Sequence, residues 1–203
     1  MIKNLKATEF GDFQTPLELA EQVAQLVFEQ YPYIKSLLEP TCGIGNFIRA
    51  SIKLNDNLKS VYGWEINHEY IMSAKHIACN NRDTDINIEQ KDFFSANWSL
   101  LPEDLKESVL FIGNPPWVTN SELSRIGSKN LPQKTNFQNY AGFEAITGKS
   151  NFDISEWMLI KIAEYISGKK AVMSFLVKTS VARKVFLHIC RHRLLIKNIN
   201  IYN

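Results

Sequence analysis

Short apolar segments alternate with segments of helical spacing along most of this chain, and several of the apolar segments end at acidic residues or glycine. The apolar segments predict strands at residues 34–39, 61–66, 86–90, 109–113 and 171–177. Apolar residues at helical spacing predict a helix that Thr15 caps, and further helices at 46–54, 68–80, 153–166 and 182–195. Strands and helices that alternate at this spacing form successive βαβ units. We therefore expect an α/β fold with a doubly wound, mostly parallel, Rossmann-like sheet.

The length of 203 residues favours one domain, 1–203, with a long polar loop at 118–151. The apolar alternation of Ile196 to Tyr202 predicts one more strand, and because the chain stops inside it, we expect a fragment of a longer protein. Residues 1–12 contain no apolar core of a signal peptide, and no stretch reaches the length of a membrane span. The three cysteines lack CxxC spacing, which argues against a disulfide framework or a zinc site and favours a cytoplasmic protein.

The charge is distributed unevenly. Residues 165–203 contain eight lysines and arginines and no acid, whereas the first 164 residues contain 15 basic and 21 acidic groups. Within the polar loop, the basic residues are Arg125, Lys129, Lys134 and Lys149. A basic surface favours a polyanionic partner such as nucleic acid, although a solvated helix face explains the basic end equally well. A loop of this length in a compact domain is typical of a functional or a disordered segment.

The segment Gly113-Asn114-Pro115-Pro116-Trp117 ends the fourth predicted strand abruptly. Proline lacks the amide hydrogen that a strand needs, and it keeps the preceding residue out of the helical region. The segment therefore predicts a stiff turn that presents one amide side chain, Asn114, and one indole, Trp117. A rigid loop with a packing tryptophan would have the same sequence.

Polar groups at the ends of the first three strands outline a ligand pocket, because ligands bind at the carboxyl ends of parallel strands. Gly43 and Gly45 follow the first strand and allow close approach of a ligand to the backbone. Glu65 ends the second strand, where an acid accepts hydrogen bonds from ribose hydroxyls. Asp92 follows the third strand and is suited to the amino group of adenine, with Phe93 beside the ring. The set predicts an adenosine-containing ligand, and a nicotinamide dinucleotide fits less well because Ile48 replaces the third glycine of its motif.

Three motifs together resemble S-adenosylmethionine-dependent methyltransferases. Residues 39–47, Glu-Pro-Thr-Cys-Gly-Ile-Gly-Asn-Phe, are similar to motif I of that family, and residues 114–117 resemble the (D/N/S)PP(Y/F/W) motif of amino-methyltransferases. Phe13-Gln14-Thr15-Pro16, placed ahead of motif I, is similar to motif X of the gamma-ordered DNA adenine-N6 methyltransferases of restriction-modification systems. The resemblance spans residues 10–184 and implies a class I methyltransferase fold with S-adenosyl-L-methionine as cofactor.

The resemblance also implies roles for individual residues. Phe13 and Thr15 would help to hold the cofactor, Glu39, Gly43 and Gly45 would line its methionine side, and Glu65, Asp92 and Phe93 would bind its adenosine. Thr41, Ile66 and Asn114 complete the expected cofactor site, and the catalytic set is Asn114, Pro115, Pro116 and Trp117. Asp153 resembles the acid of motif V, and it is equally suited to cap the helix that follows it.

The chemistry of an aromatic amine explains why such a turn is needed. The lone pair of adenine N6 is delocalised, so acceptors at the Asn114 side chain and the Pro115 carbonyl would stabilise the charge that develops when it attacks a sulfonium methyl group. Trp117 would stack on an adenine flipped out of double-stranded DNA, and the basic loop residues would contact phosphates. No metal is required.

Several alternatives stay open from the sequence alone. The same turn occurs in methyltransferases that act on RNA or on the glutamine of release factors, and the chain could also be a non-catalytic, cofactor-binding interaction module. The DNA target sequence is not predicted. We expect target recognition to reside in a C-terminal domain or a restriction subunit outside this chain, and we expect no membrane partner.

Overall fold

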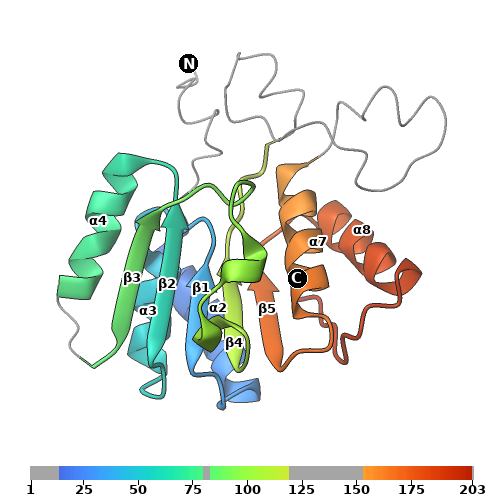
Figure 1. Ribbon diagram of the computed structural model, residues 1–203, viewed down its shortest axis with the longest axis horizontal. Helices are drawn as coiled ribbons and strands as arrows, with labels where there is room; N and C mark the ends of the chain where they lie inside the picture. The colour runs from blue at the N-terminus through green and yellow to red at the C-terminus, as the bar shows by residue number, and fades with distance from the viewer. Residues whose placement is uncertain (1–13, 80–82, 119–152, 203) are drawn as a thin grey trace.

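The computed structural model describes residues 14–79, 83–118 and 153–202, and within them the chain forms a five-stranded parallel sheet with helices on both faces (Figure 1). The strand order is β3-β2-β1-β4-β5, so the first strand lies at the centre and the order reverses beside it. The strands are β1 Ser36–Glu39, β2 Ser60–Glu65, β3 Asp85–Gln90, β4 Val109–Gly113 and β5 Ala171–Phe175. This topology confirms the predicted doubly wound α/β fold.

Five helices of eight or more residues accompany the sheet in the described part of the chain. They are α2 Leu17–Gln30, α3 Asn46–Leu54, α4 His68–Cys79, α7 Ile154–Ile166 and α8 Thr179–Arg191, with the short 3-10 turns η1 Trp98–Leu100 and η2 Glu103–Leu105 between β3 and β4.

The two faces of the sheet are buried against different layers, because side chains alternate along each strand. Leu37 and Leu110 pack with α2, α3 and α4 on one face, whereas Leu38 and Phe111 pack with η1, η2 and α7 on the other. A third cluster joins α7 to α8. Both faces of β1 and β4 are therefore covered, which explains why every residue of these two strands is buried and why β4 is apolar without alternation.

Two predicted boundaries were wrong. Thr15 does not cap α2; Pro16 occupies the N-cap position and its carbonyl oxygen accepts a hydrogen bond from Ala20 N at 3.1 Å. Thr15 is instead buried, and its carbonyl oxygen accepts a hydrogen bond from the side chain of Asn46. The last helix also begins earlier than expected, at Thr179, and it ends earlier, at Arg191, because the positive φ of 52° at Arg193 is incompatible with a continuing helix.

The strand predicted at Ile196 to Tyr202 is absent, since residues 194–202 adopt neither helix nor strand. Alternation of apolar residues marks a segment that is able to form a strand, but a strand also needs a hydrogen-bonding neighbour. Here Leu195 N donates to the Ser167 hydroxyl and Ile196 N donates to the Leu194 carbonyl, so neither amide pairs with β5. Leu195, Ile201 and Tyr202 are exposed.

No helix in the described part of the chain is long and apolar enough to cross a membrane.

Candidate functional site at the carboxyl edge of the sheet

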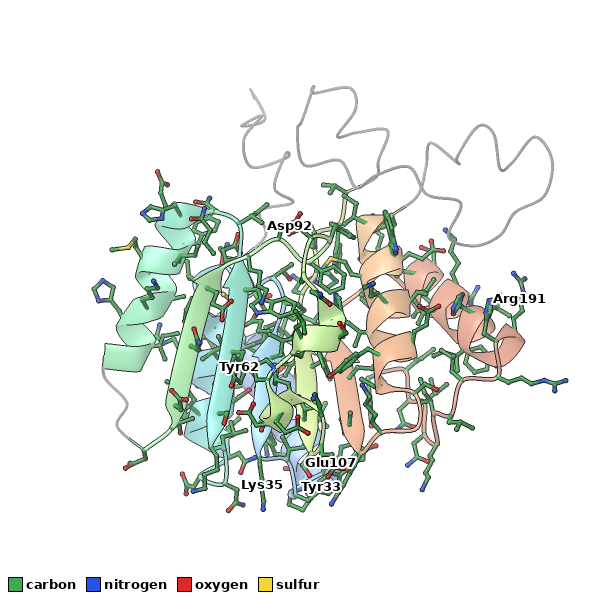
Figure 2. All side chains as sticks on the ribbon, viewed as in Figure 1. Tyr33, Lys35, Tyr62, Asp92, Glu107 and Arg191 are labelled. Atoms are coloured by element: carbon green, nitrogen blue, oxygen red, sulfur yellow. The ribbon has the colours of Figure 1, made fainter. Side chains whose placement is uncertain are left out.

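The ends of the parallel strands bring the predicted site residues to one edge of the sheet. Glu39, Glu65 and Gly113 are the last residues of β1, β2 and β4, and Asp92 lies two residues beyond β3. Figure 2 shows Asp92 at this edge and Tyr33 and Lys35 at the opposite one. Residues that are far apart in the sequence therefore share one region, as expected for a doubly wound sheet.

The glycine-rich turn after β1 is held by the segment that precedes α2. The Oε1 atom of Gln14 accepts a hydrogen bond from Ile44 N at 3.1 Å, and Asn46 Nδ2 donates to the Thr15 carbonyl at 2.8 Å. Gly43 has a φ of +51°, and a Cβ atom built on it would lie 2.4 Å from Gln14 Oε1. Only glycine leaves room for Gln14 at this position.

Gly45 has a different reason to be glycine. It is the N-cap residue of α3 with a left-handed φ of +83°, and a Cβ atom there would lie 2.6 Å from the Cδ1 atom of Ile77 on α4. The glycine at this position thus lets α3 and α4 approach each other closely.

Glu39 is a buried acid, with only 3% of its surface exposed. Burial raises the pKa of its carboxyl group well above the ordinary value, the charge of Glu65 raises it further, and a hydrogen bond from the Ile48 backbone opposes both. A Cβ atom built on Gly113 would lie 3.8 Å from Glu39 Oε1, so this carboxyl group lies against the end of β4.

Glu65 joins β2 to the glycine-rich turn. Its Oε2 atom accepts a hydrogen bond from Gly43 N at 2.9 Å, and its Oε1 atom accepts from Ile66 N and Asn67 N at 2.8 Å each. A carboxylate has about four acceptor positions, so these three bonds leave capacity for one further donor. Sequence reasoning assigned Glu65 to a ligand and missed this bracing role.

Asp92 and Phe93 differ sharply in exposure. Asp92 is exposed, and its Oδ1 atom accepts a hydrogen bond from Phe94 N at 2.9 Å. Phe93 is 3% exposed, and its ring packs edge-on against Phe94 and Trp98. Phe94 is half-buried and its ring centroid lies 5.1 Å from that of Trp157 on α7, which places an aromatic cluster beneath the Asp92 turn.

The Asn114–Trp117 turn leaves the sheet directly after β4. Pro115 is buried, while Trp117 is 39% exposed and its Nε1 atom donates to the Leu176 carbonyl at 3.4 Å. The Gly113 and Val118 carbonyls accept hydrogen bonds from Leu176 N and Ile154 N, both at 3.0 Å. Bonds to the segment after β5 and to the start of α7 therefore brace the turn on both sides.

Unpartnered acceptors gather at this edge. Five buried side-chain atoms have no hydrogen-bond partner among the described residues, and three of them are Glu39 Oε2, Thr41 Oγ1 and Asn114 Oδ1. The others belong to Ser51 on α3 and Trp98 in η1. Leaving such a group unpaired costs about 1–3 kcal/mol, so these atoms are suited to a ligand that brings hydrogen-bond donors. A ligand with an amino group and hydroxyl groups fits this donor requirement.

Cys42 lies in the glycine-rich turn, and its surroundings do not suit a nucleophile. The thiol of Cys42 is buried, and burial raises its pKa well above the ordinary value. A thiol in such surroundings stays protonated and packs as an apolar group. No cluster of three or more His, Cys, Asp or Glu side chains suited to a metal occurs in residues 14–79, 83–118 and 153–202.

Some predicted site residues lie outside the described residues, namely Phe13 and the four basic residues Arg125, Lys129, Lys134 and Lys149. Ile66 is described and exposed, directly after β2. Asp153 caps α7: its Oδ1 atom accepts hydrogen bonds from Ser155 N and the Ser155 hydroxyl, and its Oδ2 atom pairs with Lys178 Nζ at 2.9 Å. The contacts of Asp153 are therefore those of a helix cap.

Sequence reasoning missed two residues that assemble this region, Gln14 and Asn46. Gln14 lies inside the motif X-like segment and Asn46 inside the motif I-like segment, so both belong to segments that the sequence had singled out. Their contact across about thirty residues of sequence could not be read from either segment alone.

The sequence of the chain matches a known protein family. Residues 1–180 match the family described as N-6 DNA Methylase. The chain is 45% identical over 196 residues to the type II methyltransferase M.NspV of Nostoc sp. (strain ATCC 29411 / PCC 7524), which covers 96% of this chain and 41% of that protein. It is 32% identical over 130 residues to the type II methyltransferase M.VspI of Vibrio sp. (strain 343), covering 61% of this chain and 27% of that protein. The chain thus spans less than half the length of these relatives.

Solved structures show the same fold. The methyltransferase subunit of a type I restriction-modification system from Streptococcus thermophilus superposes with a TM-score of 0.57 at 13% identity, covering 89% of this chain and 39% of that one. A candidate RNA methyltransferase from Pyrococcus horikoshii superposes with a TM-score of 0.56 at 14% identity, covering 91% and 72%. At such identities the likeness concerns the fold, and it confirms the predicted class I methyltransferase architecture. Since the family match covers most of its residues, the chain belongs to the N-6 DNA methylase family.

Proposed function

We propose that this chain is the cofactor-binding and catalytic part of an enzyme that transfers the methyl group of S-adenosyl-L-methionine to the N6 amine of adenine in DNA. The observation that carries the proposal is the Asn114 side chain. Its Oδ1 atom is buried and has no partner among the described residues, at the end of a central strand and directly before two prolines. Such an acceptor, held in place before the substrate arrives, suits an amine that must gain positive charge as it reacts.

The cofactor would be held by the carboxyl edge described above. Glu39 and Thr41 offer unpartnered oxygen atoms to the amino-acid end, and the turn at Gly43 and Gly45 offers backbone close to it. Glu65 and Asp92 would accept hydrogen bonds from the ribose and the adenine, beside Ile66 and Phe93. When bound, the cofactor supplies a methyl group on a positively charged sulfur atom.

The protein's own part in the reaction would be to orient and polarise the amine. Asn114 Oδ1 and the Pro115 carbonyl accept its two hydrogen atoms, which draws the nitrogen lone pair out of the ring and stabilises the charge that develops. The braces from Leu176 and Ile154 hold these acceptors in position, so little reorganisation is needed at the moment of transfer. Trp117, partly exposed beside them, would stack on the flipped adenine.

DNA as the substrate is supported by the family and by the names of the two relatives, which are type II methyltransferases. The proposed setting is a restriction-modification system. We propose that phosphate contacts come from the 118–151 segment and that sequence recognition comes from a target-recognition domain or a partner subunit.

The test is direct detection of the product. The whole protein that contains this chain would be expressed in cells that lack adenine methylation, and their DNA would be digested to nucleosides for mass spectrometry. We expect N6-methyldeoxyadenosine, and protection of the DNA from a restriction enzyme with the same target. In parallel, purified protein would be incubated with labelled cofactor and DNA, RNA or release factor. Labelling of RNA or release factor without DNA would overturn the proposed substrate.

A further inference from the structure

The carboxyl group of Glu39 lacks the surroundings that an ionised acid needs. It is 3% exposed, and its Oε2 atom has no partner among the described residues. Its neighbours include the Ile48 amide at the start of α3 and Gly113 at the end of β4. An isolated carboxylate in such a site pays a large desolvation penalty, which a single amide hydrogen bond offsets only in part.

The titratable groups facing Glu39 do not favour its charge either. Glu65, at the end of β2, is an acid, and Cys42, in the glycine-rich turn, carries a buried thiol. No basic side chain of the described residues is among the groups that shift the Glu39 pKa, which lies well above its ordinary value chiefly because of burial. On α3 the Ile48 backbone forms a hydrogen bond with the carboxyl group, and on β4 Gly113 lies against it.

We propose that Glu39 is a neutral carboxylic acid in the free protein and that the ammonium group of an incoming ligand ionises it. This inference rests on the function proposed above, because the ligand is the methyl donor with its amino-acid end. The O–H bond of Glu39 breaks, its proton passes to solvent, and the resulting carboxylate accepts a hydrogen bond from the ammonium group. The cation supplies both the opposite charge and the donor that the site lacks.

The two acids of the site would then bind different parts of the ligand. Glu65 already accepts three backbone N–H bonds and suits neutral hydroxyl groups. Glu39 keeps one oxygen without a partner and suits a cation. A ligand without the ammonium group would leave Glu39 neutral, so proton release becomes a signature of recognition of the amino-acid end.

The experiment is isothermal titration calorimetry of the 203-residue chain at pH 7 in phosphate and in Tris, buffers with different ionisation enthalpies. The slope of the binding enthalpy against the buffer ionisation enthalpy gives the protons released. We expect about one proton released per molecule of S-adenosylmethionine and of S-adenosylhomocysteine, which both carry the ammonium group. We expect none for 5′-methylthioadenosine, which lacks it.

Two variants sharpen the result. Glu39→Gln keeps the size of the side chain and an acceptor for the Ile48 amide. It should abolish proton release and lower the affinity for S-adenosylmethionine about tenfold, and the affinity for 5′-methylthioadenosine should not change. Glu29→Gln, at an exposed position on α2, should behave like the original chain.

The outcomes separate this inference from the proposed function. Binding of S-adenosylmethionine without proton release, or equal release from the Glu39→Gln variant, would overturn the role of Glu39 and leave the methyltransferase proposal standing. Failure of the folded chain to bind any of the three compounds would count against the cofactor assignment itself, and with it against both proposals.

Discussion

The side chain of Asn46 donates a hydrogen bond to the backbone carbonyl of Thr15 at 2.8 Å. Asn46 is the first residue of α3, in the glycine-rich turn region, and Thr15 precedes α2. With the bond from Ile44 N to Gln14 Oε1, this contact ties the segment before α2 to the proposed cofactor site. The two motif-like segments are thus one structural unit.

Removing this contact should weaken cofactor binding. Asn46→Ala leaves the Thr15 carbonyl without its donor, and a hydrogen bond of this kind contributes about 1 kcal/mol, or roughly a fivefold change in affinity. Calorimetry with S-adenosylmethionine would measure the effect. Asn57→Ala, at an exposed position whose side chain makes no comparable bond in the described residues, is the matched control. Equal affinity of both variants would show that the contact does not support the site.

Asn114→Ala tests the proposed acceptor for the amine. We expect methyl transfer by the whole protein to fall by about 100-fold or more, since removal of a transition-state hydrogen-bonding group has effects of this size. The affinity for S-adenosylmethionine should stay within a few fold. Steady-state transfer of labelled methyl to DNA and cofactor calorimetry would be measured together, and a parallel loss of both would contradict the assigned role.

Loss of the Trp117 side chain should weaken the binding of target DNA more than the binding of the cofactor. Trp117→Ala removes a half-exposed indole, and stacking of an aromatic side chain on a base contributes about 1–3 kcal/mol. Fluorescence anisotropy would compare intact target DNA with DNA that has an abasic site opposite the target adenine. We expect weaker binding of intact target DNA by the alanine variant and substantial recovery in Trp117→Phe. An alanine variant with unchanged DNA binding and turnover would rule out stacking.

Glu39→Gln should stabilise the free protein, and more so as the pH rises. The raised pKa of Glu39 means that the folded chain keeps its proton at pH values where the unfolded chain, with an ordinary pKa of about 4.3, has released it. Rising pH therefore favours unfolding of the original chain from about pH 4 upward, until the folded-state pKa is reached. Glutamine removes this dependence.

Thermal unfolding from pH 4 to pH 8 would measure that difference. The melting temperature of Glu39→Gln should exceed that of the original chain by a few degrees at pH 8, and the gap should shrink toward pH 4. Glu29→Gln should show no such trend. A constant gap across the pH range would argue against a neutral Glu39 in the folded state.

The order of strands and helices could be predicted because it follows from local sequence patterns. Continuous apolar runs such as Val109 to Ile112, bounded by prolines or glycines, mark strands buried on both faces, and the spacing of apolar residues marks the helices. The predicted boundaries of α3 and the predicted end of β4 agree with the structure. Placement of Glu39, Glu65, Asp92 and Asn114 at one edge followed from parallel pairing alone.

Other features depended on contacts between distant segments. Whether Ile196 to Tyr202 becomes a strand depends on a neighbour with free backbone groups, which local alternation cannot reveal. Thr15 has the side chain of a helix cap, yet Asn46 holds its carbonyl and Pro16 takes the cap position.

The sequence by itself determined the fold class, the family motifs and the set of polar residues at the strand ends, because these follow from periodicity and from parallel pairing. Only the tertiary structure decided how those residues differ. Glu65 meets three backbone donors, whereas Glu39 is enclosed with one oxygen unpaired. Two glutamates at the ends of neighbouring strands thus lie in different surroundings, because solvation and hydrogen bonding are properties of the folded chain.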